Sequence, residues 1–401
     1  MSTSTTDPGG ARKGPPLPIL LAALTGGHLF GNCTVIAIAA IATDLKRELG
    51  ISAEDYGWLI GIYMIVQGVI AIPGGLLIDY LGARIVFATS MLLAAGGTAA
   101  VASADTFWAA FFGMFLVGAG YGLVNPCTSK TVFDVFPKNR RGSAMGIKQT
   151  GVPLGGVLGA MVAGTLVADF GRAQVLYGFA IVIGLAASMA LLLPYRRGRP
   201  EAPPFAGMMA VMRDKNLQIF NTAIGIFQAS MYSMLANIAA YCREVLAAEP
   251  ALASACLSIA QAASAVGRLS WGALSDLAFA ARRKPVLLII GTVGTLSLLT
   301  MATTSTNWPF YLVLALAFPT GLAAAGYVGL TQTVCVEASD PKLTATAVGS
   351  NRIFTSAGAG IGLPFYGWVV DTYGYSAAWL SLSVIFALGT MVIAFWFRES
   401  R

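Results

Sequence analysis

Charged residues are scarce in this sequence of 401 residues. They make up 11% of it, against about 25% in an ordinary soluble protein, and 56% of the residues are hydrophobic. The apolar residues gather in segments of about 20 residues, the length that crosses a bilayer. Twelve such segments cover residues 17–42, 54–79, 84–104, 107–133, 142–169, 173–194, 217–242, 251–276, 285–304, 308–336, 344–371 and 375–397. The composition excludes a water-soluble fold and predicts an all-α membrane protein with twelve transmembrane helices, six in each half.

Histidine and catalytic motifs are also scarce. The chain has one histidine, His28, and five cysteines without metal or redox spacing, which we interpret as small apolar packing residues. No motif for a nucleophile, a metal or a nucleotide is present, so we expect neither an enzyme nor a cofactor. Without an ATP-binding loop, any transport must draw its energy from gradients.

Apolar character is missing from two further stretches. Residues 1–16 are polar and lack the apolar core of a signal peptide, so a disordered cytoplasmic tail is expected. Residues 196–215 are rich in Arg, Pro and Gly and predict a cytoplasmic linker, with a short helix at 208–213. The linker would join an N-terminal six-helix bundle, 17–195, to a C-terminal one, 216–401.

Lysine and arginine are nearly absent from one side of the predicted membrane. If the N-terminus is cytoplasmic, four lie outside, namely Lys46, Arg47, Arg172 and Arg243, and seventeen lie inside. This asymmetry predicts a multi-pass protein of the cytoplasmic (inner) membrane with both termini in the cytoplasm. It also explains the net charge of +7 without a nucleic-acid partner.

No aspartate or glutamate lies deep in any predicted helix, but four cations do. Lys130 has Asp134 one turn later as a pairing partner, so a structural role is favoured. Lys148, Arg268 and Arg352 have no such partner, and a lysine at the centre of a helix costs roughly 2.5–3.5 kcal/mol to insert. An anion between these three cations would relieve their repulsion. The pattern disfavours cationic substrates.

Each of these residues also has a structural interpretation. Lys148 lies seven residues after Arg141 and could extend toward the cytoplasm, and the arginines could bind carbonyl groups at helix crossings. His28 could carry a proton or only donate a hydrogen bond. We nevertheless predict a substrate site of three cations with polar neighbours from both halves. These neighbours are His28, Asn32, Gln67, Gln149, Gln228, Tyr232 and Tyr327.

A short motif follows the second predicted helix and recurs in the second half. It places Gly75, Asp79, Gly82 and Arg84 in the pattern Gly-x-x-x-Asp-x-x-Gly-x-Arg. This pattern resembles the signature loop of the major facilitator superfamily, and its second copy contains Gly272 and Asp276. The resemblance implies two pseudo-symmetric six-helix bundles, with these six residues in loops that gate the conformational change.

Two arginines carry a narrower resemblance. The run Arg268-Leu-Ser-Trp-Gly272 is similar to the helix 8 arginine of monocarboxylate and oxalate-formate transporters, and Arg352 resembles the helix 11 cation of oxalate-formate exchangers. The resemblance implies that both guanidinium groups face a substrate carboxylate. Proton-coupled monocarboxylate transporters carry an aspartate one turn before the arginine, where this chain has Ser264. That route for protons is therefore in doubt.

Together these features predict a monomeric secondary transporter of a small organic anion, a mono- or dicarboxylate. Its two bundles would rock to give alternating access, by proton symport or anion exchange. The alternative is a drug or neutral-solute exporter, because Gly151-Val-Pro153-Leu-Gly155-Gly156 resembles the antiporter motif of helix 5. The spacing from Pro153 to the Gly155-Gly156 pair is one residue shorter than in that motif. No lysine or arginine lies between Asp105 and Lys130, so the helix 4 arginine of proton-drug antiporters is absent. A third alternative is a porter of inorganic anions or a sensor that does not transport.

Overall fold

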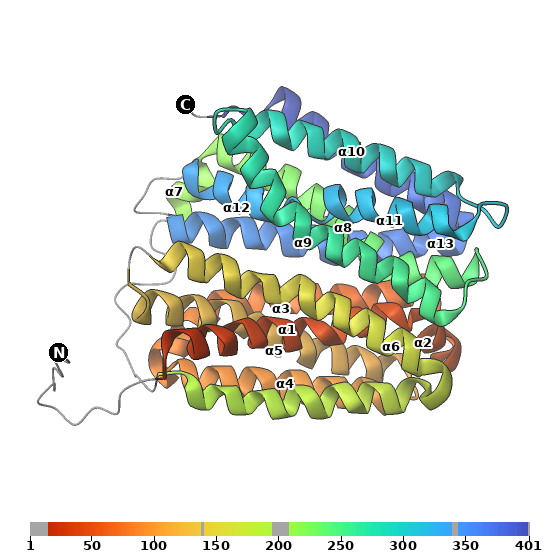
Figure 1. Cartoon of the computed structure of the whole chain (residues 1–401), viewed down its shortest axis with the longest axis horizontal. Coiled ribbons are helices and arrows are strands. Elements are labelled where there is room, and N and C mark those ends of the chain that lie inside the picture. Colours follow the sequence, from red (N-terminus) through yellow and green to blue (C-terminus); the bar gives the residue numbers. More distant parts are fainter. Residues whose placement is uncertain (1–14, 138–139, 195–207, 339–343, 400–401) are drawn as a thin grey trace, which may run out of the picture.

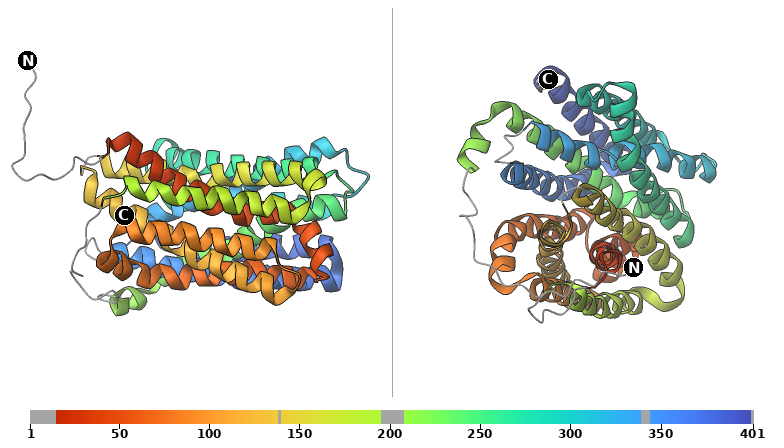
Figure 2. Two further views of the ribbon diagram at one scale, coloured as in Figure 1. Left: turned by 90° about the horizontal axis from the view of Figure 1, so that it is seen from below. Right: turned by 60° about the vertical axis from the view of Figure 1, so that its left-hand side comes forward.

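The computed structural model describes residues 15–137, 140–194, 208–338 and 344–399. Within these ranges the ordered elements are all helical. Most of the long helices run in similar directions and form two groups, α1 to α6 below and α8 to α13 above (Figure 1). The same two groups are separate in the right-hand view of Figure 2. The predicted all-helical fold of two bundles is confirmed.

The helices of the first bundle follow the predicted segments closely. They are α1 (Leu17–Ala40), the short α2 (Ala42–Leu49), α3 (Ala53–Leu81), α4 (Ala83–Ala102), α5 (Phe107–Val135), α6 (Arg141–Ala186) and the 3-10 helix η2 (Ala187–Leu192). After α7 (Met208–Arg213), the second bundle contains α8 (Lys215–Glu244), α9 (Pro250–Ala278), α10 (Arg283–Thr303), α11 (Phe310–Ala324), α12 (Val328–Glu337) and α13 (Thr344–Phe395). The predicted single helix 308–336 is thus broken into α11 and α12.

Two glycines explain why α6 and α13 are so long. Gly171 in α6 and Gly374 in α13 have φ angles of 77° and 81°, so each joins two helices across a kink. Only glycine adopts this conformation without strain. In the described residues nine helices are long and apolar enough to span a membrane, and two of these contain the kinks. Together with α3, they are consistent with the twelve predicted spans.

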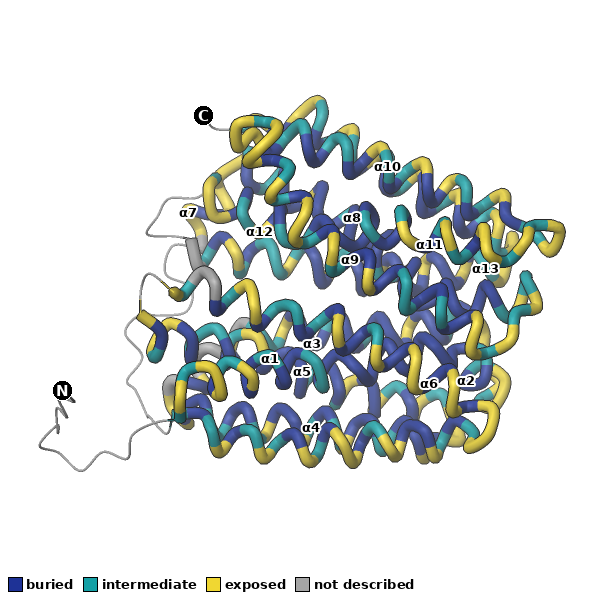
Figure 3. Tube along the Cα trace, viewed as in Figure 1, coloured by how far each residue is buried: buried dark blue, intermediate teal, exposed yellow. Residues whose placement is uncertain are grey.

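Apolar side chains cover the outside of the molecule. Exposed residues follow the outer faces of many helices, and buried residues lie between the helices (Figure 3). Large exposed side chains include Leu277 at 88% and Phe395 at 75%. Such an apolar surface suits the hydrocarbon of a bilayer. The helices meet the second requirement of that environment, because their backbone groups are hydrogen-bonded inside each helix. The chain is a multi-pass membrane protein.

The bundles approach most closely along α3 and α13. A Cβ atom added at Gly57 would lie 2.5 Å from the carbonyl oxygen of Leu363, and one at Gly61 would lie 2.9 Å from that of Gly360. These glycines permit backbone contact between the two bundles. At Gly349, toward the other end of this part of α13, an added Cβ would meet nothing within 4 Å.

The face of the molecule that carries α2, opposite the start of α1 and the end of α13 (Figure 1), is called the far face here. Ion pairs link the bundles across it. Two residues of α2 bind the end of α8: Asp44 binds Arg243, and Lys46 binds Glu244 at 2.9 Å. Tyr375 of α13 donates a hydrogen bond to Glu244 at 2.9 Å. We call these five residues, together with Asp371, the far-face latch.

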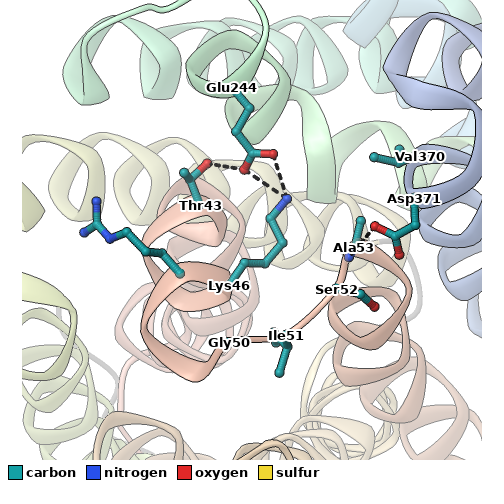
Figure 4. A pocket seen from close by; sticks show the side chains of 10 residues that line it. Thr43, Lys46, Gly50, Ile51, Ser52, Ala53, Glu244, Val370 and Asp371 are labelled. Atoms are coloured by element: carbon teal, nitrogen blue, oxygen red, sulfur yellow. Dashed lines mark hydrogen bonds and ion pairs between the residues drawn. The ribbon is translucent and has the colours of Figure 1, made fainter.

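The last member of the latch caps a helix of the opposite bundle. The carboxylate of Asp371, on α13, accepts hydrogen bonds from the backbone nitrogens of Ala53 and Glu54, at 3.0 and 2.7 Å. These are free N–H groups of the first turn of α3, where a negative charge is favourable. Asp371 and Glu244 line a pocket of about 410 Å³ (Figure 4). The latch therefore holds the bundles together on this face.

Candidate functional site

Arg352 of α13 and Gln67 of α3 meet between the bundles. The guanidinium donates a hydrogen bond from Nη2 to Oε1 of Gln67. Gln67 is 2% exposed, and its Nε2 donates to the hydroxyl of Tyr63, one turn earlier, at 3.1 Å. The bond to Tyr63 fixes the amide so that its oxygen faces Arg352. The partner of this guanidinium is therefore a neutral amide oxygen from the other bundle.

Arg268, on α9, lies in the same polar region. Its Nε is buried and has no hydrogen-bond partner among the described residues. The titratable groups within electrostatic reach of its guanidinium are Tyr121, Tyr232 and Tyr327, which come from both bundles. The charge of Arg352 also acts on Tyr121. Both arginines that were predicted from the sequence therefore lie within electrostatic reach of Tyr121.

Aromatic rings flank the two arginines. Tyr63 stacks on Tyr121 with ring centroids 6.2 Å apart. Tyr327, just before α12, donates a hydrogen bond to Oε1 of Gln228 at 2.8 Å and packs its ring edge-on against Phe227. Tyr63 and Tyr121 were not predicted as site residues. A tyrosine hydroxyl in a spanning helix needs a polar partner, and this signal could have identified them.

Lys148 of α6 is completely buried, at 0% exposure. Its Nζ donates to three side chains of α5, namely Asn125 Oδ1 at 3.0 Å, Thr128 Oγ1 at 3.0 Å and Ser129 Oγ at 2.8 Å. In this conformation these three hydrogen bonds hold it within its own bundle, and its predicted contact with substrate stays a prediction. The sequence could not show this position, because it depends on how α6 packs against α5.

His28 of α1 joins the same cluster of side chains. Its Nε2 lies 3.0 Å from Oγ1 of Thr128, and the residue is 2% exposed. The ring also makes an edge contact with Tyr121, with centroids 6.3 Å apart. In this conformation His28 therefore has no open path to a ligand between the bundles. Its predicted contact with substrate stays a prediction.

Asn32, Gln149, Gln228 and Tyr232 complete the predicted set. Asn32 donates from Nδ2 to the backbone oxygen of Val152 at 2.9 Å, which ties α1 to α6. Gln149 donates from Nε2 to Oδ1 of Asn125 at 3.2 Å. Tyr232 is half-buried and Gln228 is buried. Asn32 and Gln149 therefore already have protein partners, so they contribute to packing as well as to polarity.

The first predicted gate loop is described only in part. The burial of Gly75 and the side chain of Asp79 lie outside what the structure describes. Gly82, with a φ angle of 84°, forms the turn between α3 and α4. The guanidinium of Arg84 donates to the backbone oxygens of Leu191 and Leu193, at 2.9 and 3.0 Å. These bonds tie the loop to the end of the same bundle.

The second gate loop forms an ion-pair network. Arg283 donates to Asp276 at 2.5 Å and to Glu337 at 2.9 Å, which joins α9, α10 and α12. At Gly272 an added Cβ would meet nothing within 4 Å, so packing in this conformation does not require glycine there. Sequence reasoning placed Asp276 and Arg283 in the loop but did not predict their ion pair or the contact with Glu337.

Metal ligands do not gather in the described ranges. No group of three or more His, Cys, Asp or Glu side chains is close enough there to hold a metal ion. The only charged groups between the bundles at mid-depth that the structure describes are cationic. Such an arrangement can bind a carboxylate through parallel charge-assisted hydrogen bonds.

The sequence matches known transporters over most of its length. A family model described as Major Facilitator Superfamily matches residues 23–316 and 222–401. An uncharacterized transporter of this type from Mycobacterium tuberculosis is 28% identical over 327 residues, which are 79% of this chain and 71% of that protein. Multidrug resistance protein MdtH from Yersinia enterocolitica is 25% identical over 91% of each chain.

Solved structures share the fold. The nucleoside transporter NupG, as a D323A mutant, superposes with a TM-score of 0.78 at 18% identity, covering 94% of this chain and 98% of that one. A bacterial homologue of the human lysosomal transporter Spinster, in an inward-facing and occupied conformation, gives 0.74 at 17% identity and covers 94% of each chain. At these identities the likeness shows the fold alone.

Proposed function

Because this chain belongs to the Major Facilitator Superfamily of secondary transporters, we propose that its substrate is a small organic anion, a mono- or dicarboxylate. One observation carries the proposal. Arg268 and Arg352 lie in a common polar region between the bundles, and within the described ranges neither forms an ion pair with a carboxylate. Two such cations at mid-membrane are costly unless an anion compensates them.

A carboxylate would bind more strongly here than the groups now in place. Arg352 is bound by the neutral amide oxygen of Gln67, and Nε of Arg268 is unoccupied. The bond from Arg352 to Gln67 has a charged donor only, whereas a carboxylate adds a countercharge and can accept two parallel N–H bonds from one guanidinium. A substrate carboxylate would therefore displace Gln67 from Arg352 and occupy Arg268 with its second oxygen or second carboxylate group.

Displacement of Gln67 would connect substrate binding to movement of the bundles. The bond from Arg352 to Gln67 joins α13 to α3, next to the close approach at Gly57 and Gly61. The far-face latch closes one side of this region. We propose that this side faces the cell exterior, because few lysines and arginines lie there. The described conformation would then exchange substrate with the cytoplasm.

A second candidate has one observation in its favour. MdtH, a relative covering 91% of this chain, is named a multidrug resistance protein, and the rings of Tyr63, Tyr121 and Tyr327 could bind a flat lipophilic molecule. A neutral or cationic drug would leave both arginines uncompensated. The exporter is therefore the weaker proposal.

A thermal-shift screen of the purified protein separates the two candidates. The panel holds monocarboxylates, dicarboxylates, aromatic acids, inorganic anions and neutral drugs, because a ligand of the folded state raises the melting temperature. The expected result is a shift with one carboxylate class that is lost in Arg352→Gln and Arg268→Gln. Arg213→Gln, which alters an exposed residue on α7, should keep the full shift. Shifts only with neutral drugs, or undiminished shifts in both arginine variants, would contradict the proposal.

A further inference from the structure

The ammonium group of Lys148 has a complete set of hydrogen-bond partners and no countercharge. Its three N–H donors meet three acceptors, Asn125, Thr128 and Ser129. All three acceptors are neutral, and the described residues contain no carboxylate paired with Lys148. Three hydrogen bonds satisfy the geometry of the group but do not compensate its charge in a buried site.

The hydroxyl of Thr128 shows how the neighbouring histidine is protonated. Its single hydrogen is directed to the helix carbonyl oxygen of Val124, at 2.8 Å. The oxygen can therefore only accept from its other two neighbours, Nζ of Lys148 and Nε2 of His28, each at 3.0 Å. It follows that Nε2 of His28 carries a proton. The other ring nitrogen, Nδ1, is buried and has no hydrogen-bond partner among the described residues.

The groups that face this cluster add positive charge. Lys148 of α6, Arg268 of α9 and Arg352 of α13 all act on His28 of α1. From α5, Cys127 is the titratable group that acts on Lys148. All three cations thus act on one imidazole, which shares the oxygen of Thr128 with Lys148. Arginine does not release its proton in proteins, whereas a buried lysine does so readily.

The cluster also accommodates a neutral lysine. An uncharged amine has two N–H donors and one lone pair, and Asn125 and Thr128 can still accept from the two donors. The hydroxyl of Ser129 can rotate and donate to the lone pair, because its oxygen now only accepts from Lys148 at 2.8 Å. Both protonation states therefore keep Nζ of Lys148 hydrogen-bonded to its three partners on α5. A purely structural cation would not need this adaptable third partner.

We propose that Lys148 is a proton-binding site of the transporter, which empties when no anion lies between Arg268 and Arg352 and fills when an anion arrives. In the release step one N–H bond of Nζ breaks, the electron pair stays on nitrogen, and the proton passes to water. The site would make the substrate anion and one proton bind together. This consequence rests on the proposed function, whereas the proton site itself does not.

Lysine labelling tests the site without a substrate. The chain has eight lysines, so protein labelled with ¹⁵N-lysine gives few side-chain signals. The sample is kept in a buffer free of carboxylate and phosphate, and the signal that Lys148→Met removes is assigned to Lys148. The expected result is that this signal changes from ammonium to amine between about pH 6 and pH 9, below the range of ordinary lysines. Lys130→Met, which removes a lysine of α5, should leave that change intact.

The opposite result is equally clear. If the Lys148 signal remains that of an ammonium group up to about pH 9, the residue is a fixed structural cation and the proposal is overturned. Should Lys148→Met fail to fold, Lys148→Gln, which can keep hydrogen bonds to α5, provides the assignment.

A second arm adds sodium formate or sodium oxalate, the smallest mono- and dicarboxylate, at a pH where the amine is seen. If either salt raises the melting temperature, the Lys148 signal should return to that of ammonium, and an unchanged signal would overturn the coupling. If no anion of any kind binds, the proposed function fails while the first arm still decides the proton site.

Discussion

Lys148 and His28 share one oxygen atom, Oγ1 of Thr128, at 3.0 Å from each nitrogen. Three helices, α1, α5 and α6, therefore meet on a single hydroxyl group. Removing this oxygen leaves one donor of Lys148 and one of His28 buried without an acceptor, and such a loss costs about 1–3 kcal/mol per group.

The first prediction follows from that shared oxygen. Thr128→Val, which has nearly the same shape, should lower the unfolding free energy by about 2–4 kcal/mol in denaturant titrations. In the Lys148→Met background the same change should cost less, because only His28 then loses its acceptor. Equal costs in the two backgrounds would show that Lys148 does not depend on Thr128.

Gln67 should act as a competitor of the substrate and not as a ligand for it. Gln67→Leu leaves Arg352 free, so a carboxylate that binds the wild type should bind roughly 2- to 10-fold more tightly, the equivalent of about 0.5–1.5 kcal/mol. Gln67→Glu should place a permanent carboxylate on Arg352 and weaken binding by at least about 10-fold. Calorimetric titration measures both, and weaker binding to Gln67→Leu would mean that Gln67 contacts the substrate.

How far the sequence could predict this region depends on the residue. The helices, and the presence of Arg268 and Arg352 within them, followed from apolar segments and charge alone. The position of Lys148 did not, because burial against Thr128 and Ser129 is decided by the packing of α6 on α5. The bond between Gln67 and Arg352 joins residues 285 positions apart, and no local pattern predicts such a contact.

The kinks show a second limit of sequence reasoning. Gly171 and Gly374 turn the chain without a loop of several residues, and the sequence indicated only that apolar segments end and begin nearby. The far-face latch was also missed. Asp44, Arg243 and Asp371 look like ordinary charges at helix ends, and only the tertiary structure pairs them across the bundles.

The far-face latch should hold the described conformation closed. Asp371→Asn removes the charge that caps α3, and Arg243→Gln removes the ion pair with Asp44. In either variant a cysteine introduced at Ala236, which is buried and accepts a hydrogen bond from Tyr56 at 3.1 Å, should react several-fold faster with a polar maleimide. The five native cysteines are buried and provide a low background.

A control for the latch is available on the same helix. Asp55→Asn disturbs the cap that Asp55 and Ser52 form within α3, but it breaks no bond between the bundles. Its labelling rate should match that of the protein without a latch change. If Asp55→Asn and Asp371→Asn accelerate labelling equally, local fraying of α3 explains the effect and the latch does not.

Loss of the proton site should separate anion binding from proton coupling. For a carboxylate that stabilises the wild type, Lys148→Met should bind the anion more weakly at acidic pH and should lose the wild type's dependence of affinity on pH, because the variant cannot take up the proton that binds with the anion. Uptake into proteoliposomes should no longer increase with an inward proton gradient, whereas exchange between labelled and unlabelled substrate continues. A gradient response equal to that of the wild type would place the coupling elsewhere.

The most direct test of the central claim is uptake of a radiolabelled carboxylate, chosen by the thermal-shift screen, into proteoliposomes that contain wild type, Arg268→Gln, Arg352→Gln or Arg213→Gln. The account predicts saturable uptake with wild type and Arg213→Gln. It also predicts at least about a 10-fold loss of uptake at low substrate concentration with either buried-arginine variant, which corresponds to about 1.4 kcal/mol. Uptake at the wild-type rate in both buried-arginine variants would contradict it, because the anion would then cross the membrane without contact with the two guanidinium groups.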